Sequence, residues 1–427
     1  MAKTHYRYTL FFLVLILALI NYIDRGALSY SGEFIIAEYG LDKKSWGNVL
    51  GFFGYGYMFG ALLGGVLSDR FGPKKVWLFA GVFWSIFEML TAWAGDIGMM
   101  FFGGSVLAGF AVMRILFGFA EGPAYSLINK TISNWASPKE RGFVVSMGLL
   151  STPLGALLTA PVAVFLLSYS GSWRLTFVVL GIAGLIALFF LLRVMTDYPQ
   201  QNRRVSQAEL AIIGEKIPSQ TPAEESVGVK WWHFFKSRTL VLNTVGYFAF
   251  NYVNFLLLTW TPKYLQDTFG YDLFSLWYMG MIPWVGACVT ILLGGKISDF
   301  LLHKTGSLRV ARGYFAAVLL LLTTLSFLSI NLVTSVTLVI AIIAIGNALN
   351  SFANTVYWSV VIDTSPRQKV GTFSGIMHFL GNIASVAAPT LTGYLVAARG
   401  YEAMFIAAAV VTCVGMFCML LIKPGKL

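Results

Sequence analysis

Charged side chains are scarce in this sequence. Asp, Glu, Lys and Arg make up 11% of its 427 residues, whereas a soluble globular chain is about 25% charged. This shortage of solubilising side chains excludes an ordinary soluble enzyme and a disordered chain. Cysteine is also rare. Cys288, Cys413 and Cys418 all lie in apolar stretches, which favours buried core residues over a disulfide framework.

The sequence also lacks the usual signatures of a reaction centre. It has four histidines, and they form no metal-spaced cluster with cysteine. No Gly-rich phosphate loop and no plausible nucleophile–base pair is present. We therefore predict that the protein is not an enzyme and holds no metal and no cofactor.

Long apolar blocks take the place of these features. Hydrophobic residues make up 57% of the chain and the mean hydropathy is +0.73. The blocks are roughly 20 residues long, which is the length that crosses a bilayer as an α-helix. The first block runs on into Asn21–Arg25 without a small-residue cleavage site, so we expect a retained span and not a signal peptide. Twelve transmembrane helices are predicted, at about 8–30, 47–68, 75–95, 99–128, 142–168, 173–194, 239–261, 274–297, 311–330, 335–361, 371–397 and 402–422.

One long polar stretch divides the apolar blocks. It contains Pro199, Pro218 and Pro222, and the pattern Ser206–Glu209 is typical of a capped helix start. We predict an N-terminal six-helix bundle over 1–195, a cytoplasmic linker over 196–238 with perhaps one short surface helix, and a C-terminal six-helix bundle over 239–427.

The distribution of Lys and Arg predicts the orientation. If both termini are cytoplasmic, 23 of the 30 Lys and Arg residues fall on the cytoplasmic side, as the positive-inside rule requires. The net charge of +11 is therefore a membrane signature and does not indicate nucleic-acid binding. We expect a multi-pass membrane protein in contact with lipid, with both termini cytoplasmic.

The two halves of the chain repeat each other. Leu62–Asp69 recurs as Leu292–Asp299, an offset of 299 − 69 = 230 residues. Two six-helix halves of parallel order are typical of a secondary transporter, in which the halves rock about a site between them. The predicted fold is therefore an all-α membrane protein with 12 transmembrane helices in two pseudo-symmetric six-helix bundles.

A glycine- and charge-rich loop follows the second predicted span. Its pattern consists of Gly65, Asp69, Arg70, Gly72 and Lys74. A degenerate second copy of the pattern contains Asp299. Glycine permits tight turns and close helix approach, and the charges are placed to pair across helix ends and hold one conformation. The loop resembles the signature of the major facilitator superfamily, and the resemblance covers the whole chain.

Several motifs narrow this resemblance. They are Asn21–Arg25, Arg114 with Glu121, Pro138–Gly142, Leu258–Pro262 and Gly375 with Gly381 and Asn382. Together they look like the anion:cation symporter family, which includes bacterial sugar-acid/proton symporters, sialin and the vesicular glutamate transporters. The long region of the third and fourth spans and the stretch Gly381–Ser385 look most like the glucarate/galactarate branch. The resemblance implies a monomer in the bacterial inner membrane.

Five charged residues fall in the interior of predicted spans, away from the basic loops: Asp24, Arg25, Glu88, Arg114 and Glu121. An ionised side chain at the centre of a membrane helix costs about 2.5–3.5 kcal/mol even on lenient scales, so these residues need a reason. Paired packing between helices is one reason. For Asp24 and Arg25 a second reason is a position at the outer end of the first span. For Glu88, pairing with Arg114 or a position at the interface is as plausible as a role in function.

The spacing of these charges favours a functional site. Arg114 and Glu121 are seven residues apart and so share one face of the fourth span, while Asn21, Asp24 and Arg25 share a face of the first. The resemblance implies that both faces line a central cavity. Arg25, helped by Asn21 and Tyr22, is then expected to bind a carboxylate through its planar fork.

Proton coupling is assigned to Asp24, Glu121 and Arg114. In this hypothesis an arriving carboxylate weakens the hold of Arg25 on Asp24, so that Asp24 takes up a proton. Arg114 holds Glu121 ionised in one state and releases it in the other.

The second half contributes neutral polar groups. Asn254 occupies the repeat position of Asp24, because 24 + 230 = 254. For each neutral polar residue of the second half, two interpretations are about equally plausible: a hydrogen bond between helices, or a contact with the substrate. In the fifth span Ser151 and Thr152 pose the same choice, because a hydroxyl can also bond its own helix. The predicted substrate contacts outside the first span are Thr152, Asn251, Asn254, Tyr357, Trp358, His378 and Asn382.

Two positions depart from the family pattern. Sugar-acid members usually carry a glutamine near Thr152 and an asparagine at His378. An imidazole changes both the size and the charge of a pocket, although His378 might only bond Asn350 or Asn382. We predict a proton-coupled symporter for an organic carboxylate, most plausibly an aldarate, aldonate or hexuronate. An aromatic-acid symporter, a proton-driven exporter and a transporter-like nutrient sensor remain alternatives.

Overall fold

The computed structural model describes residues 5–137, 141–214, 230–366 and 370–425, with no side chains described for 141–143 and 145–146. Every regular element in these ranges is helical. Eleven helices are long and apolar enough to cross a membrane, and a bent pair brings the number to twelve. The predicted all-helical membrane fold is thus confirmed. The stretch 215–229, with Pro218 and Pro222, and residues 138–140 of the Pro138–Gly142 motif lie outside the described residues.

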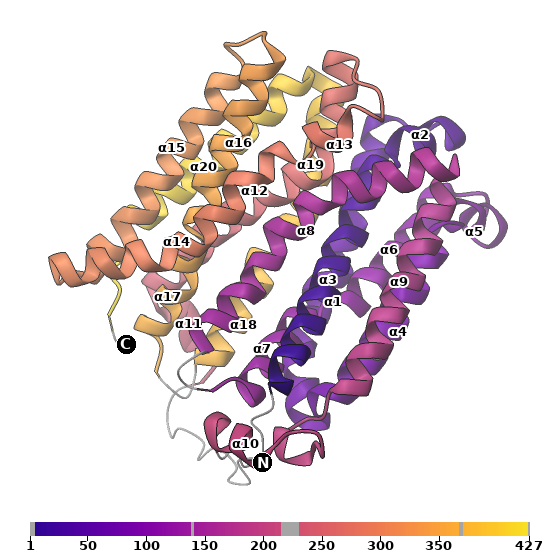
Figure 1. Cartoon of the computed structure of the whole chain (residues 1–427). Helices are drawn as coiled ribbons and strands as arrows, with labels where there is room; N and C mark the ends of the chain where they lie inside the picture. The colour runs from indigo at the N-terminus through magenta and orange to yellow at the C-terminus, as the bar shows by residue number, and fades with distance from the viewer. Residues whose placement is uncertain (1–4, 138–140, 215–229, 367–369, 426–427) are drawn as a thin grey trace.

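The first half of the chain contains nine helices within its described residues (Figure 1). They are α1 (Tyr6–Tyr30), α2 (Gly32–Tyr39), α3 (Lys43–Phe71), α4 (Pro73–Thr91), α5 (Ala94–Phe101), α6 (Val106–Glu121), α7 (Ala124–Trp135), α8 (Arg141–Ser170) and α9 (Trp173–Val194). Helix α1 continues beyond Asp24 and Arg25 to Tyr30, so these two charges lie inside the span and do not end it.

The boundary between the third and fourth spans differs from the prediction. The expected break at Asp96 lies within α5, which turns by 77° from α4. The actual break is at Gly103 and Gly104, whose φ values of 62° and 84° favour glycine. Ser105 then caps α6, because its hydroxyl accepts a hydrogen bond from the Ala108 amide at 3.2 Å. The fourth span consequently runs over Val106–Trp135 and not over 99–128.

The linker contains three short elements: η1 (Pro199–Gln201), α10 (Gln207–Ile213) and α11 (His233–Lys236). Helix α10 begins at the predicted cap, where Ser206 accepts from the Glu209 amide at 3.3 Å. Glu209 is fully buried. Its carboxylate accepts from the backbone amides of Tyr6 and Arg7, each at 3.1 Å, and pairs with the Arg7 guanidinium at 3.0 Å. The linker is therefore joined to the start of α1.

The described residues of the second half repeat the helical pattern. The elements are α12 (Arg238–Phe269), α13 (Leu276–Met279), α14 (Ile282–Thr305), the π-helical turn η2 (Arg309–Tyr314), α15 (Phe315–Ile330), α16 (Val336–Phe352), α17 (Asn354–Thr364), α18 (Val370–Gly381), α19 (Ala384–Arg399) and α20 (Tyr401–Leu421). In Figure 1 the first half and the second half stand side by side, with both termini and α10 toward the lower end and α2 and α13 at the upper end. We call these ends the terminal face and the opposite face.

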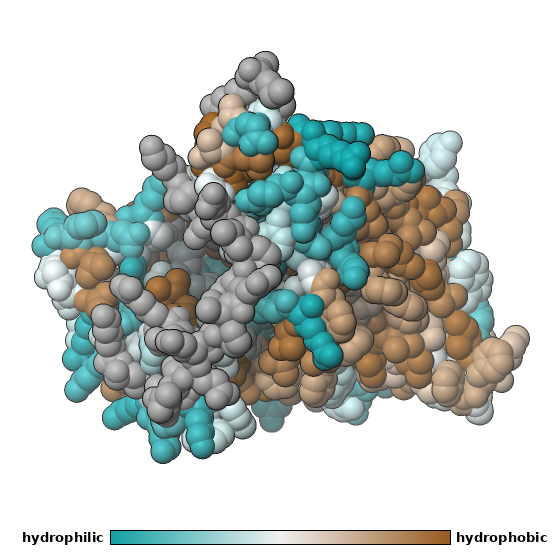
Figure 2. All heavy atoms as spheres, turned by 90° about the horizontal axis from the view of Figure 1, so that it is seen from below, coloured by the Kyte–Doolittle hydropathy of each residue, from teal (hydrophilic) through white to brown (hydrophobic). Residues whose placement is uncertain are grey.

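The two faces differ in polarity and in contacts between halves. Figure 2, seen from the terminal face, shows hydrophilic side chains gathered there beside an apolar flank. At the opposite face Lys43 pairs with Asp267 at 3.2 Å, and Gln266 donates to Glu33 at 2.7 Å. Helix α3 packs closely against α19 there. A Cβ on Gly47 would lie 2.9 Å from the Gly393 Cα. The two halves are thus latched together at the opposite face.

Candidate functional site

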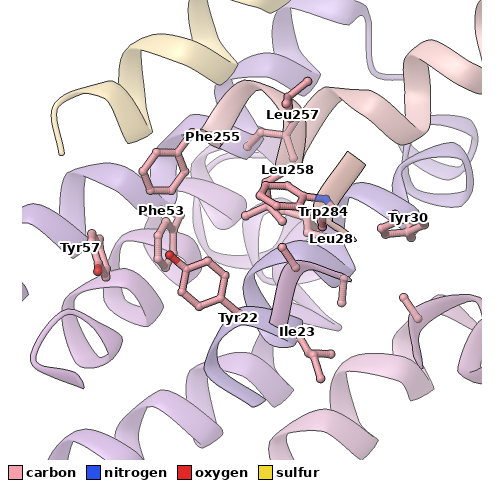
Figure 3. Packing of buried hydrophobic residues seen from close by; sticks show 14 of the residues in the cluster. Tyr22, Ile23, Leu28, Tyr30, Phe53, Tyr57, Phe255, Leu257, Leu258 and Trp284 are labelled. Atoms are coloured by element: carbon pink, nitrogen blue, oxygen red, sulfur yellow. The ribbon is translucent and has the colours of Figure 1, made fainter. Parts of the chain in front are cut away.

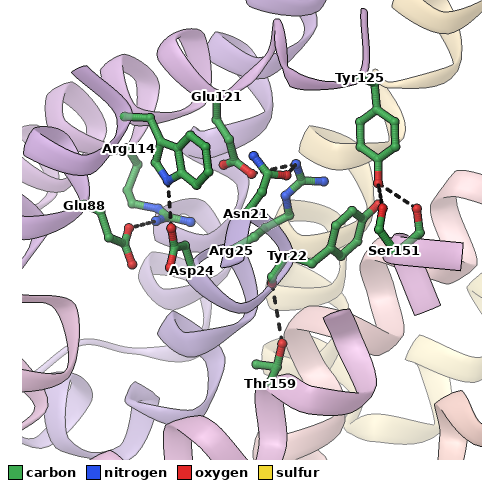
Figure 4. A network of polar contacts seen from close by, with 12 residues as sticks. Asn21, Tyr22, Asp24, Arg25, Glu88, Arg114, Glu121, Tyr125, Ser151 and Thr159 are labelled. Atoms are coloured by element: carbon green, nitrogen blue, oxygen red, sulfur yellow. Dashed lines mark hydrogen bonds and ion pairs between the residues drawn. The ribbon is translucent and has the colours of Figure 1, made fainter. Parts of the chain in front are cut away.

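The five charged residues of the spans form one buried cluster. Asp24 and Arg25 lie on α1, Glu88 on α4, and Arg114 and Glu121 on α6 (Figure 4). No member of the cluster is more than 4% exposed. The pairs Arg25–Glu121 and Arg114–Glu88 join side chains of the three helices. Figure 3 shows Tyr22 of α1 with Phe53 and Tyr57 of α3, whose rings lie around Arg25. The predicted shared faces on α1 and α6 are therefore brought together.

Arg25 and Glu121 make the shortest ion pair of the cluster. The Arg25 Nη2 atom donates to Glu121 Oε1 at 2.9 Å and lies 3.5 Å from Asn21 Oδ1. The pair is incomplete, because Arg25 Nε and Glu121 Oε2 are both buried without a hydrogen-bond partner among the described residues. One of the two parallel bonds that a guanidinium can give a carboxylate is thus not made.

Aromatic rings enclose the Arg25 guanidinium. Its Cζ atom lies 4.7 Å from the ring centroids of Tyr22 and Phe53, and 4.5 Å from that of Tyr57. Phe255, from α12 in the second half, is 5.8 Å away. Within about 6 Å each such ring attracts a cation. The rings therefore hold the charged group in an environment with little water.

Among the remaining charges, the pairing of Glu88 with Arg114 confirms one interpretation of Glu88, whereas the partners of Asp24 and Arg25 differ from the prediction. Asp24 Oδ2 accepts a hydrogen bond from the Trp84 indole at 2.7 Å. Arg114 Nη1 lies 3.9 Å from Glu88 Oε2, an ion pair without a hydrogen bond. Arg25 thus pairs with Glu121 and not with Asp24, and Arg114 pairs with Glu88 and not with Glu121. Sequence spacing shows which side chains share a helix face, but not which helix lies opposite.

A group of hydroxyls borders the cluster. The Tyr125 hydroxyl lies 2.8 Å from Thr152 Oγ1 and 3.4 Å from Ser151 Oγ, and its ring meets that of Tyr22 edge-on at 6.3 Å. Ser151 also donates to its own helix, at the Gly148 carbonyl. Ser151 therefore bonds the backbone of its own helix, which is one of the two interpretations of this residue. Thr152 instead bonds Tyr125 of the neighbouring helix α7.

The predicted residues of the second half fall into two groups. Asn251 and Asn254 are buried on α12. Tyr357 and Trp358 of α17 and His378 of α18 meet around Tyr247, a residue not predicted, whose ring centroid lies 5.8, 5.7 and 6.1 Å from theirs. The Tyr247 hydroxyl lies 3.0 Å from His378 Nδ1, and Asn382 Nδ2 lies 3.2 Å from the same atom. Asn350 instead donates to the Phe250 carbonyl at 3.1 Å, so its role is interhelical.

The charged loop has a structural role at the terminal face. Asp69 pairs with Lys130 at 2.5 Å, and in the second copy Asp299 pairs with Arg312 at 3.0 Å. Gly72, with φ of 82°, brings the chain next to Asp197, whose carboxylate caps α4 by accepting from the Lys74 amide at 2.8 Å. The Arg70 guanidinium lies over the Phe71 ring at 5.2 Å.

The expected close approach at Gly65 is wrong. A Cβ there would meet only Ser126 Oγ, at 3.9 Å, which is an ordinary contact. The crowded glycine is its neighbour Gly64, where a Cβ would lie 2.5 Å from the Pro123 Cα. The pattern of the loop located the right helix end but the wrong residue of the Gly64–Gly65 pair.

One apolar pocket lies apart from these groups. It has a volume of about 170 Å³ and is lined by side chains of α1, α7 and α8, among them Phe11, Leu15, Ile132 and Met147. None of the charged or predicted site residues lines it. Within the described residues, no group of three or more His, Cys, Asp or Glu side chains is arranged to hold a metal ion.

The residues that sequence reasoning missed are neutral and aromatic. Trp84, Tyr57, Tyr125 and Tyr247 each contact a predicted residue. With 15% aromatic residues in the chain, a ring within an apolar span carries no signal that separates a site residue from the core. Three of the four stand four residues from a residue that the sequence singles out: Tyr125 from Glu121, Trp84 from Glu88 and Tyr247 from Asn251. This spacing, which places two side chains on one helix face, is the signal that could have indicated them.

A bundle of apolar helices with paired charges buried between them defines a membrane transporter, and the chain belongs to the Major Facilitator Superfamily, whose family model matches residues 14–389. It is a transporter and not an enzyme. It is 32% identical to the hexuronate transporter of Bacillus subtilis (strain 168), over 89% of this chain and 86% of the relative. It is 31% identical to a probable galactarate/D-glucarate transporter of the same organism, over 93% of this chain and 87% of the relative.

Solved structures agree with the fold. The crystal structure of a D-xylose-proton symporter superposes with a TM-score of 0.72 at 19% identity, covering 98% of both chains. A bacterial homologue of the human lysosomal transporter Spinster, in an inward-facing and unoccupied conformation, gives a TM-score of 0.71 at 16% identity, covering 98% of this chain and 94% of that chain.

Proposed function

We propose that this protein is a proton-coupled symporter that imports a sugar acid by alternating access. Relatives named as transporters of hexuronate, galactarate/D-glucarate and D-galactonate support the class of substrate. The buried, half-paired Arg25 guanidinium is the observation that carries the proposal, because it supplies a cation shaped for a carboxylate.

The proposal includes an orientation. The terminal face is the cytoplasmic one, in a bacterial inner membrane, and the halves 1–195 and 239–427 move about the site while 196–238 connects them. The 23 of 30 Lys and Arg residues that this orientation assigns to the cytoplasmic side support it. The protein works as a monomer in contact with lipid.

Substrate binding follows from the incomplete Arg25–Glu121 pair. Glu121 uses one oxygen on Arg25, while Arg25 Nε remains without a partner among the described residues. A substrate carboxylate that makes both parallel bonds gains a second charge-assisted hydrogen bond. The substrate carboxylate therefore displaces Glu121 from Arg25.

Proton uptake follows from this displacement. A buried carboxylate that loses its cationic partner is left uncompensated, which costs about 3–5 kcal/mol. Glu121 removes that cost by taking up a proton. Binding of the anion and binding of the proton thus occur together, and neither is favourable alone.

The charge balance of the cluster extends the argument to stoichiometry. Asp24, Glu88 and Glu121 are three carboxyls, and Arg25 and Arg114 are two guanidiniums, all buried. One proton shared by Asp24 and Glu88, beside the charged Arg114, makes the empty site neutral. A bound monocarboxylate keeps it neutral only if one further proton enters. The predicted ratio is therefore one proton per carboxylate, with no net movement of charge.

Uptake by purified protein in proteoliposomes tests the proposal. With radiolabelled glucuronate as the probe, an inward proton gradient should drive accumulation, and a membrane potential alone should not. Glu121→Gln should abolish gradient-driven accumulation yet retain exchange of substrate for substrate. Glu402→Gln, at an exposed position of α20, is the matched control and should behave as wild type. Wild-type accumulation by Glu121→Gln would overturn the proton role.

A further inference from the structure

Three large aromatic side chains are exposed together at the start of the second half. Trp231, Trp232 and Phe235 are 56%, 41% and 51% exposed. Their rings adjoin one another, because the centroid of Trp231 lies 5.8 Å from that of Trp232 and 6.3 Å from that of Phe235. Exposed apolar side chains that gather in this way mark an interaction surface. The coupling scheme does not use it.

Phe234 fixes these rings to the bundle. Its side chain is fully buried, and its ring meets that of Phe373 of α18 edge-on at 5.6 Å. Figure 1 shows α11 beside α18. The turn that leads into α11 is closed by the Lys230 amide, which donates to His233 Nδ1 at 2.9 Å. One ring is thus packed inward while its neighbours are held outward, so their exposure belongs to a folded segment.

Basic residues accompany the exposed rings. Lys230, Lys236 and Arg238 are exposed, and none of them forms an ion pair within the described part of the chain. The Lys230 Nζ atom lies 4.8 Å from the centroid of the Trp232 ring, so charge and ring are in contact. The sequence from 226 to 266 contains no Asp or Glu that could balance these cations. We call the six exposed residues the basic aromatic surface: Lys230, Trp231, Trp232, Phe235, Lys236 and Arg238.

Two spans show where this surface lies relative to the membrane. Residues 239–262 of α12 and 403–422 of α20 carry no charge, and at the terminal face they are bounded by Arg238 and Lys423. The two boundaries meet, because the Thr239 hydroxyl donates to the Lys423 carbonyl at 3.0 Å and accepts from the Lys423 amide at 3.2 Å. Uncharged helical stretches of about 20 residues cross the hydrocarbon core. The basic aromatic surface, which ends at Arg238, therefore lies at the level of the lipid headgroups.

Rings and cations at this level are suited to anionic lipid. Tryptophan is enriched at the membrane interface, where its ring lies between headgroups and acyl chains. Lysine and arginine close to the membrane are attracted to anionic headgroups within a Debye length of the surface. Binding strengthens with the apolar area buried and with this attraction. A soluble protein fits less well, because it would have to displace lipid from the headgroup layer to cover the rings.

We propose that the basic aromatic surface binds an anionic phospholipid at the terminal face. The lipid phosphate pairs with Lys236 and Arg238, and the rings of Trp231, Trp232 and Phe235 lie against the upper part of the acyl chains. A zwitterionic lipid gains less here, because its headgroup carries a cation of its own. This binding is independent of the acid that is transported and of the coupling scheme.

Thermal unfolding of the full-length protein in detergent with added lipid measures the binding, because a lipid that binds the folded state raises the Tm. Dioleoyl phosphatidylglycerol should raise the wild-type Tm more than dioleoyl phosphatidylcholine does. Lys236→Gln combined with Arg238→Gln should lose at least half of this difference, while its Tm without lipid stays at the wild-type value.

A matched pair of arginines provides the control. Arg203→Gln combined with Arg204→Gln removes the same charge at two exposed positions of the linker, and it should keep the wild-type difference between the two lipids. No difference between the lipids in the wild type would overturn the proposal. An equal loss in both double variants would also overturn it, since any surface charge would then have the same effect.

Brominated lipids test the depth of the rings. The chain has 12 tryptophans, so the useful signal is the fluorescence that Trp231→Phe combined with Trp232→Phe removes from the wild type. In phosphatidylglycerol vesicles with bromine near the headgroup, this signal should fall at least twofold, and bromine at the end of the acyl chain should quench it less. The signal that Trp46→Phe removes belongs to a buried ring and should not be quenched. An unquenched signal from Trp231 and Trp232 would place their rings away from lipid and overturn the proposal.

Discussion

The guanidinium of Arg25 donates a single hydrogen bond, of 2.9 Å, to the carboxylate of Glu121, and both side chains are buried. The two residues come from helices that are 96 positions apart in sequence. Because the pair leaves one donor and one acceptor unused, it binds less tightly than a complete fork. A substrate carboxylate that makes two hydrogen bonds to Arg25 can therefore replace Glu121 at the guanidinium.

Arg25→Lys should weaken substrate binding while the protein still folds. Lysine keeps the charge but loses the planar fork and most of the stacking on Tyr22, Phe53 and Tyr57. A loss of about 1.4 kcal/mol corresponds to a tenfold rise in KM for glucuronate uptake. Arg193→Lys, at an exposed arginine over the Phe189 ring, should leave KM unchanged. An unaltered KM in Arg25→Lys would contradict the role in binding.

Trp84→Phe should destabilise the first half. The variant removes the donor at 2.7 Å from Asp24 Oδ2, in a site with no access to water. A buried acceptor left unsatisfied costs about 1–3 kcal/mol, so the apparent Tm in detergent should fall. Trp77→Phe, on the same helix, removes a long bond of 3.4 Å to Thr131 and should lower the Tm less. A larger fall in Tm for Trp77→Phe than for Trp84→Phe would show that the hydrogen bond from the Trp84 indole to Asp24 contributes little stability.

Glu88 and Arg114 should be energetically coupled. Glu88→Gln or Arg114→Gln alone leaves a buried charge without its nearest partner. The double variant removes both charges and should lose less stability than the sum of the single losses, with a coupling of about 0.5–3 kcal/mol. Thermal unfolding of the four proteins in one detergent measures this cycle. Additive losses would show that the 3.9 Å separation carries no useful interaction.

Gly47→Ala should loosen the latch at the opposite face. The new Cβ would lie 2.9 Å from both the Gly393 Cα and the Pro389 carbonyl oxygen, so the helices must separate. In a background without the native cysteines, Ser385→Cys should then react faster with a water-soluble thiol reagent added at that face. Gly371→Ala meets no atom within 4 Å and should not change the rate. Equal rates would indicate that α3 and α19 tolerate the methyl group without moving.

Glu38 should give the protein part of its acid sensitivity. It lies on α2, outside the spans, and bonds from both Arg174 nitrogens hold its pKa below the usual 4.5. Because the pKa is lower in the folded state, the stabilisation is present above the unfolded value and is lost as pH falls through the folded one. With a side chain 37% exposed, its contribution is at most about 1 kcal/mol. Glu38→Gln should therefore reduce the fall in Tm below pH 4.5. An unchanged fall would exclude the Glu38 carboxyl as a source of the acid sensitivity.

The sequence predicts the fold well because a membrane leaves few choices. Span length follows from bilayer thickness, and every backbone group must bond within the helix. The sixth span was placed at 173–194, the bounds that α9 has. The failure at Asp96 has a plain cause. A single charge within an apolar stretch does not end a helix, whereas two glycines at positive φ, Gly103 and Gly104, do.

The site was less predictable. Asp24, Arg25, Arg114 and Glu121 are identified because charge in a membrane is rare. The pairing of Arg114 with Glu88 is among the expected ones, but Arg25 pairs with Glu121 and not with Asp24. The partner of Arg25 depends on how α1 and α6 face each other in the bundle, and the guanidinium also packs against the Phe53 and Tyr57 rings of a third helix, α3. No local pattern reports such packing.

Glu209 gives the chain an order of assembly. Its carboxylate supplies acceptors for the amides of Tyr6 and Arg7, which begin the helix that carries Asp24 and Arg25. During synthesis the Glu209 carboxylate reaches these amides only after about two hundred further residues have been made, because Glu209 follows the sixth span. The Glu209 acceptors for the first turn of α1 therefore become available only after the residues of all six spans of its half have been synthesised. A ribosome that stops before residue 209 leaves a helix whose first turn still lacks its cap.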